Sequence, residues 1–135
     1  MNRPLLDTHA WVWWICGDSR LTAHERETLD NLPPTARPVL SEISLWEVAM
    51  LVDLGRLELD MDLERWLAVA SAPATVELAR ITPAVAAEVA RLPEMFHRDP
   101  ADRLIVATAR VMKLRVLTRD QKITKARVVP LWRAS

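Results

Sequence analysis

The sequence predicts an α/β fold in which helices cover both faces of a short central parallel sheet, forming a three-layer α/β/α sandwich. Short apolar runs alternate along the chain with longer segments of helical periodicity, which is the pattern of parallel sheets. The expected strands are apolar throughout, as strands buried on both faces should be. With 135 residues and no visible linker or repeat, the chain is expected to form a single domain over residues 1–135.

Helix boundaries in the first half of the chain follow from capping residues and glycines. Thr22 and Ser44 are each followed three residues later by a glutamate, Glu25 and Glu47, which is the spacing of a capping box. The two glycines of the sequence are expected to end the helices that precede them. The expected strands are residues 4–6 and 38–40, and the expected helices are residues 8–15, 22–32, 44–54 and 62–70.

The second half of the chain continues the alternation. A helix begins at Thr82-Pro83, because proline suits the first helical turn. The segment before this helix alternates in polarity, as a strand does. The expected strands are residues 75–81, 115–118 and 128–129, and the expected helices are residues 82–92 and 100–113.

Composition excludes several classes of protein. The single cysteine, Cys16, rules out an internal disulfide and a cysteine-based zinc site, and it is expected to be a small core residue. Two glycines are too few for a P-loop or a dinucleotide-binding fingerprint. Neither a leader peptide nor an apolar run of roughly 18 residues is visible, so we expect a cytoplasmic protein with no membrane attachment.

The zero net charge conceals a segregation of charge along the chain. Residues 1–97 hold 8 Arg/Lys against 15 Asp/Glu, whereas residues 98–135 hold 10 against 3. The three acids of the basic segment are Asp99, Asp102 and Asp120. Carboxylates surrounded by arginines suit a polyanionic substrate that is bound through metal ions. The basic residues equally suit solvated helix faces.

Four carboxylates adjoin apolar runs that should be buried: Asp7, Glu47, Asp102 and Asp120. Asp7 and Asp120 follow expected strands, and the other two fall in the first turns of expected helices. Because the carboxyl ends of parallel strands meet at one edge of a sheet, all four are expected on that rim. Buried carboxylates need a partner, and four together would bind Mg²⁺ or Mn²⁺.

Each carboxylate also has a local interpretation. Asp7 and Asp120 suit helix caps or turns, Glu47 suits a capping box with Ser44, and Asp102 suits the positive end of its helix dipole. A shared site is favoured because four separate local roles would have to fall on the same rim by accident.

Further residues are expected to support such a site. Asp99 precedes Pro100 and is a natural helix cap, which also places it near the ligands. The hydroxyl groups of Ser44 and Thr118 are expected to orient ligands by hydrogen bonding, although capping and strand packing explain both residues equally well. The candidate phosphate contacts are Arg98, Arg103, Arg119 and Lys122.

At these residues the chain resembles PIN domains, and in particular the VapC-type toxin ribonucleases of bacterial toxin–antitoxin pairs. Four segments carry the resemblance, in the order in which they occur in the family. They are residues 5–10 (LLDTHA), 41–49 (SEISLWEVA), 97–109 (HRDPADRLIVATA) and 117–120 (LTRD). The α/β/α sandwich of that family agrees with the fold expected above.

The resemblance implies a metal-dependent endoribonuclease that cleaves RNA phosphodiester bonds with a metal-activated water. The metal ligands of the family correspond to Asp7, Glu47, Asp102 and Asp120, with Mg²⁺ or Mn²⁺ as cofactor, and Asp99 belongs to the same motif. It also implies a homodimer and a cognate antitoxin. Some of four tryptophans are expected to line the antitoxin groove or the dimer contact, and burial of all four in the core is the alternative. These tryptophans are Trp11, Trp13, Trp14 and Trp46.

Other functions stay open at this point. An RNA-processing PIN enzyme or a DNA nuclease outside toxin–antitoxin systems would use the same carboxylates. A catalytically inactive PIN module would use the fold for binding alone. A signalling module with an acidic Mg²⁺ pocket is a further alternative, but a receiver-type domain clusters its acids after the first strand, where this chain has Thr8 and His9 after Asp7.

Overall fold

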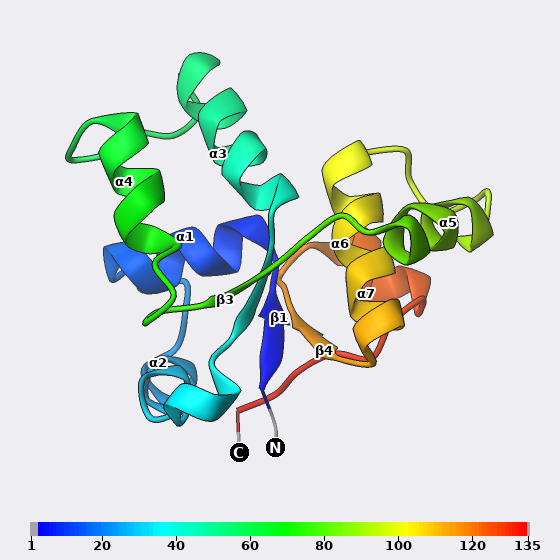
Figure 1. Cartoon of the computed structure of the whole chain (residues 1–135), viewed down its shortest axis with the longest axis horizontal. Helices are drawn as coiled ribbons and strands as arrows, with labels where there is room; N and C mark the ends of the chain where they lie inside the picture. The colour runs from blue at the N-terminus through cyan, green and yellow to red at the C-terminus, as the bar shows by residue number, and fades with distance from the viewer. Residues whose placement is uncertain (1–2, 135) are drawn as a thin grey trace.

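The computed structural model describes residues 3–134 and contains one sheet of four parallel strands. Figure 1 shows this sheet between two groups of helices, so the expected α/β/α sandwich is confirmed. The strand order is β3-β2-β1-β4. The strands are β1 (Pro4–Leu6), β2 (Val39–Ser41), β3 (Glu77–Ala79) and β4 (Arg115–Leu117).

Helices cover both faces of the sheet. One group is α1 (Thr8–Cys16), α2 (Ala23–Asp30), α3 (Ile43–Asp53) and α4 (Leu63–Ala70). The other group is α5 (Pro83–Arg91), α6 (Pro100–Met112) and α7 (Gln121–Ala126), and a 3₁₀ turn, η1 (Pro34–Ala36), precedes β2. Within the described residues, no helix is both long and apolar enough to cross a membrane.

Two hydrophobic cores form because neighbouring residues of a strand face opposite sides of the sheet. Leu6 packs in one core with Trp11 and Val48, whereas Leu5 packs in the other with Ile105. Both leucines are fully buried, and each burial stabilises the fold by about 1.5–3 kcal/mol. This two-sided burial is the reason that the strands lack the polar alternation of a half-exposed sheet.

The carboxyl ends of β1, β2 and β4 lie level with one another. Leu6 of β1 is in register with Leu40 of β2 and with Leu117 of β4. The backbone N–H of Asp7 donates to the carbonyl of Leu117 at 3.1 Å. Residues that follow β1, β2 and β4 therefore share one rim of the sheet.

Two expectations about local structure are wrong. Residues 128–129 form no strand; the chain instead meets β4 at a single parallel bridge between Val116 and Leu131. Pro130 precedes this bridge and has no N–H to extend a ladder. Cys16 is exposed rather than part of the core, because it lies in the last turn of α1, beyond the turn that Trp11 and Val12 bury.

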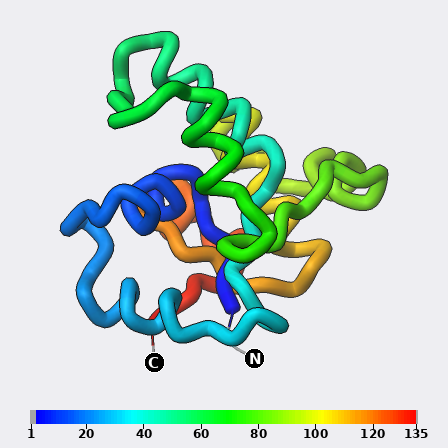
Figure 2. The backbone as a smooth tube through the Cα atoms, turned by 60° about the vertical axis from the view of Figure 1, so that its left-hand side comes forward, coloured from blue at the N-terminus to red at the C-terminus, as the bar shows by residue number. Residues whose placement is uncertain are grey.

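Figure 2 shows that the end of α3 and the loop leading into α4 stand away from the sheet. This arm places apolar side chains in solvent, with Leu54 54% and Met61 40% exposed. The opposite end of α3, by contrast, starts directly after β2 at the rim that carries the carboxylates.

Candidate metal centre

Asp7 ends the central strand and begins the first helix. Its side chain accepts a hydrogen bond from the N–H of Ala10 at 2.7 Å, so it is the N-cap of α1, and its side chain is buried. Burial raises the pKa of this carboxyl, and a hydrogen bond from the Thr118 hydroxyl opposes that rise. The helix cap and the rim position are thus compatible roles of one residue.

Glu47 faces the rim from the second turn of α3. Its carboxylate accepts a hydrogen bond from the hydroxyl of Thr8, and the Ser44 hydroxyl lies 2.9 Å from the same Thr8 oxygen. Because Thr8 donates its proton to Glu47, Ser44 must donate to Thr8. Burial raises the pKa of Glu47, as do the charges of Asp99 and Asp7.

The expected capping box of Ser44 and Glu47 is wrong. Helix α3 begins at Ile43, two residues earlier than a capping box with Ser44 as N-cap requires, and the Ser41 hydroxyl accepts the Ile43 N–H at 3.3 Å. Both Ser44 and Glu47 are buried inside the helix rather than placed at its end. Capping therefore does not explain the carboxylate at position 47.

Asp99 and Asp102 come from the start of α6. Asp99 is the N-cap of this helix and accepts the N–H of Asp102 at 3.0 Å, as expected from Pro100 at the first helical position. One carboxylate oxygen each from Glu47, Asp99 and Asp102 lie within 4.8 Å of one another. Asp99 is thus both a helix cap and a member of the carboxylate group.

Asp102 lies among the charges of all the other rim carboxylates. Its pKa is raised to about 8, first by burial and then by the charges of Asp99, Asp120, Glu47 and Asp7. The Oδ2 of Asp102 lies 3.1 Å from Nε2 of His97, but the geometry of this contact is not that of a hydrogen bond. The five carboxylates therefore act on one another across a single rim.

Asp120 approaches the rim from the end of β4. It is the N-cap of α7 and accepts the N–H of Lys122 at 2.7 Å. The Thr118 hydroxyl oxygen accepts the N–H of Asp120 at 2.9 Å and also hydrogen-bonds Asp7. Thr118 therefore links the loops after β4 and β1.

The donor set fits a divalent cation of the hard, oxygen-preferring type. It consists of carboxylate oxygens of which those of Asp7, Glu47, Asp102 and Asp120 are partly or fully removed from water, whereas Asp99 is exposed. Buried carboxylate charges are stable together only with protons or a cation among them. The raised pKa values of Asp7, Glu47 and Asp102 express this need. Mg²⁺ and Mn²⁺ prefer oxygen ligands of this kind.

The four basic residues considered for phosphate binding differ in their availability. Arg98 and Lys122 are exposed, whereas Arg119 forms an ion pair with Glu25 at the start of α2. The half-buried Arg103 donates to the backbone carbonyls of residues 89, 96 and 97. Its guanidinium therefore already donates to backbone carbonyls within the chain, unlike the exposed Arg98 and Lys122.

The four tryptophans considered for a partner contact differ in their exposure to solvent. Trp11 is fully buried and Trp13 is 9% exposed, so neither offers a surface to a partner. Trp14 is half-buried and donates to Asp30 at 2.8 Å. Trp46 is 52% exposed on α3, directly beside Glu47. Trp46 and, in part, Trp14 remain as candidates for a contact.

Two residues near the rim escaped the sequence analysis. Thr8 links Ser44 to Glu47, and its only signal was its place directly after Asp7. His97 lies against Asp102, but the histidines share no metal-ligand spacing, so no sequence pattern marked it. His9 lies close enough for its charge to oppose the rise in the pKa of both Asp7 and Glu47.

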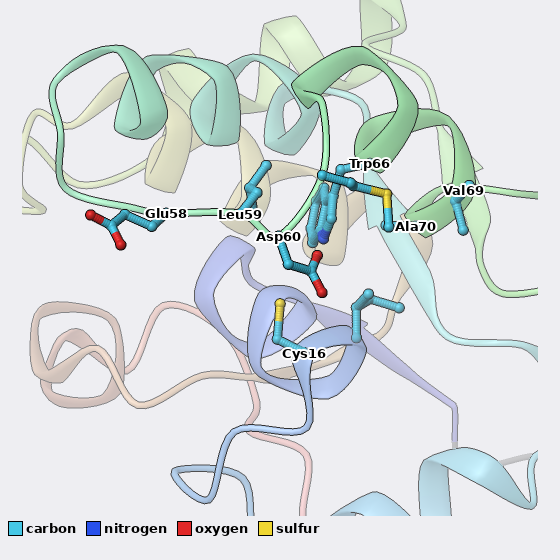
Figure 3. A pocket seen from close by; sticks show the side chains of 9 residues that line it. Cys16, Glu58, Leu59, Asp60, Trp66, Val69 and Ala70 are labelled. Carbon is cyan, nitrogen blue, oxygen red and sulfur yellow. The ribbon is translucent and has the colours of Figure 1, made fainter.

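A cavity of about 340 Å³ lies at the far end of α1 from Asp7. Figure 3 shows Cys16, Asp60 and Trp66 around it, with Val69 and Ala70 of α4. None of the five rim carboxylates lines this cavity. This cavity is therefore separate from the carboxylate rim.

Comparison with known proteins agrees with this geometry. The family model described as PIN domain matches residues 5–129. Ribonuclease VapC22 of Mycobacterium tuberculosis (strain ATCC 25618 / H37Rv) is 34% identical over 127 residues, which are 94% of this chain and 94% of that protein. A chain of the toxin–antitoxin complex from Klebsiella pneumoniae matches with a TM-score of 0.59 and 22% identity over 88% of both chains, which supports the fold alone. The family match and the 34% identity, each over nearly the whole sequence, show that the chain belongs to the PIN domain family.

Proposed function

We propose that this protein is the toxin of a type II toxin–antitoxin system and acts as a metal-dependent endoribonuclease, with the whole chain forming one domain. The observation that carries the proposal is the rim of five carboxylates, three of which place oxygens within 4.8 Å of one another. The similarity to Ribonuclease VapC22 supports RNA as the substrate class.

The metal ligands in this proposal are Asp7, Glu47, Asp102 and Asp120, and Asp99 assists them. When bound, Mg²⁺ or Mn²⁺ activates water for attack on phosphorus and stabilises negative charge on the phosphate. The chain itself fixes the ligand oxygens, because Ala10 donates to Asp7 and Thr8 donates to Glu47. Such outer hydrogen bonds orient ligands and strengthen metal binding.

Phosphate groups of the RNA would meet the exposed cations beside the rim. Arg98 precedes Asp99, and Lys122 follows Asp120 by two residues. These side chains hold the polyanion near the carboxylates, which would otherwise repel it. Arg119 forms an ion pair with Glu25, so we assign it a smaller contribution to phosphate binding than Arg98 and Lys122.

We further propose a homodimer and a cognate antitoxin as partners. The support is the exposed Trp46 on α3, because aromatic side chains are enriched at protein–protein contacts. Trp46 adjoins Glu47, so a partner that covers it would lie beside the carboxylate rim. Sedimentation of Trp46→Ser with and without antitoxin tests the assignment; unchanged dimerisation and unchanged antitoxin affinity would refute it.

Incubation of the antitoxin-free protein with total cellular RNA tests the activity directly. The reactions contain Mg²⁺, Mn²⁺ or EDTA, and the variants are Asp7→Asn and, as control, Asp53→Asn, which changes an exposed carboxylate at the end of α3. We expect discrete fragments with 5′-phosphate ends that require metal, persist in Asp53→Asn and are lost in Asp7→Asn. Absence of RNA cleavage by folded, metal-bound protein would favour a DNA substrate or a purely binding role.

A further inference from the structure

The segment that joins α5 to α6 delivers two groups to the carboxylate rim. Asp99, at its end, belongs to the carboxylate group, and His97 places Nε2 3.1 Å from Oδ2 of Asp102. Residues 92–99 belong to no helix or strand. Their position therefore depends on side-chain contacts more than on a hydrogen-bonded ladder.

Arg103 makes these contacts from the first turns of α6. Its Nη1 donates to the carbonyls of Phe96 at 2.9 Å and His97 at 3.3 Å, and its Nη2 donates to the carbonyl of Val89 at 3.3 Å. The guanidinium carbon lies 5.8 Å from the centroid of the Phe96 ring. One side chain thus joins α6, the connecting segment and the last turns of α5, which pack side by side (Figure 1).

We propose that Arg103 is a positioning residue for the metal centre, which fixes the 96–99 segment so that Asp99 and His97 stay in place beside Asp102. The inference rests on the metal site of the proposed function, but it assigns Arg103 a role other than phosphate binding. Both of its Nη groups already donate to acceptors within the chain, and its side chain is half-buried. Arg98, by contrast, is exposed and therefore accessible to a phosphate group.

The shape of the guanidinium is what suits it to this position. Its N–H groups diverge in one plane, so they hold the carbonyls of two separate segments at a fixed relative position. A lysine ammonium keeps the charge but is a single, flexible donor group that cannot reproduce this fork. Arg103→Lys therefore separates the geometric role of Arg103 from its charge.

The chain offers a matched control on the same helix. Arg110 lies two turns after Arg103, is half-buried, and donates to the carbonyl of Val128 at 3.3 Å while pairing with Glu88. It contacts none of the rim carboxylates. Arg110→Lys thus makes the same chemical change, at the same kind of backbone contact, away from the metal centre.

Calorimetric titration of the full chain with Mn²⁺, in the absence of RNA, is the test. We expect Arg103→Lys to weaken Mn²⁺ binding by about 10-fold or more, as loss of outer contacts does, and Arg110→Lys to leave it unchanged. Urea midpoints of the metal-free proteins should fall similarly in both variants. Hydrogen exchange should increase in residues 93–99 only in Arg103→Lys.

Three results would overturn the inference. Parental Mn²⁺ affinity in Arg103→Lys would do so, as would an equal loss of affinity in Arg110→Lys. An effect of Arg103→Lys confined to the KM for RNA at saturating Mn²⁺ would return Arg103 to the phosphate contacts.

Variants that do not fold are handled separately. If Arg103→Lys does not fold, Arg103→Gln replaces it, and unfolding of both variants would overturn the inference, because Arg103 would then stabilise the global fold. Failure of the parent protein to bind Mn²⁺ would instead count against the proposed function.

Discussion

At the scale of single residues, Asp102 shows the cost of assembling the rim. Its pKa of about 8 means that the folded protein holds a proton on this carboxyl up to mildly alkaline pH, whereas the unfolded chain releases it near 4. Between these values the folded state binds more protons than the unfolded state. The free energy of unfolding without metal should therefore fall as pH rises.

Asp102→Asn tests this linkage. In EDTA we expect the variant to be more stable than the parent at pH 8, because the amide removes the buried charge, and this advantage to be much smaller at pH 5. Urea unfolding at both pH values measures the effect. A parent protein that becomes more stable on going from pH 5 to pH 8 without metal would contradict the prediction.

Thr8→Val tests the hydrogen bonds behind Glu47. Valine keeps the shape of threonine but leaves a buried Glu47 oxygen without its donor, which should cost about 1–3 kcal/mol of stability and weaken Mn²⁺ binding about 10-fold. Thr108→Val is the control, since Thr108 is equally buried but donates to Leu104 within α6. Similar Mn²⁺ affinities in the two variants would remove Thr8 from the site.

At the scale of elements, the two capping-box spacings of the sequence have different outcomes. The capping box of Thr22 and Glu25 is present in both directions at the start of α2. The same spacing at Ser44 and Glu47 is not a cap, because α3 starts earlier and turns both side chains inward. A four-residue pattern does not encode which way a helix faces.

Thr22→Ala should destabilise α2 by about 1 kcal/mol, the usual cost of losing an N-cap. Thr28→Ala is the control on the same helix, because its hydroxyl donates to the His24 carbonyl and caps nothing. Chemical denaturation compares the two variants. Glu25, the other residue of this capping box, also pairs with Arg119, so we expect a small loss of nuclease activity in Thr22→Ala but not in Thr28→Ala. Equal losses of stability in the two variants would refute the capping role of Thr22.

At the scale of the whole molecule, the basic segment 98–135 contributes three of the five rim carboxylates as well as the exposed Arg98 and Lys122 beside them in the sequence. Lys122→Ala should reduce the salt dependence of RNA binding, lowering the slope of log K against log salt by about 0.7 for single-stranded RNA. Binding is measured on cleavage-deficient Asp7→Asn with Mg²⁺. Arg65→Ala, an exposed cation on α4, is the control, and an equal change in both would exclude a specific contact.

The sequence by itself determined the alternation of helices and strands, the apolar strands, and the placement of Asp7 and Asp120 after strands, because these depend on local periodicity and neighbouring residues. It did not determine the inward turn of Ser44 and Glu47, the contact of His97 with Asp102, or the engagement of Arg103 with carbonyls. Those features depend on packing between segments distant in the chain. Only the tertiary structure sets their distances, directions and burial, and with them the pKa of Asp102.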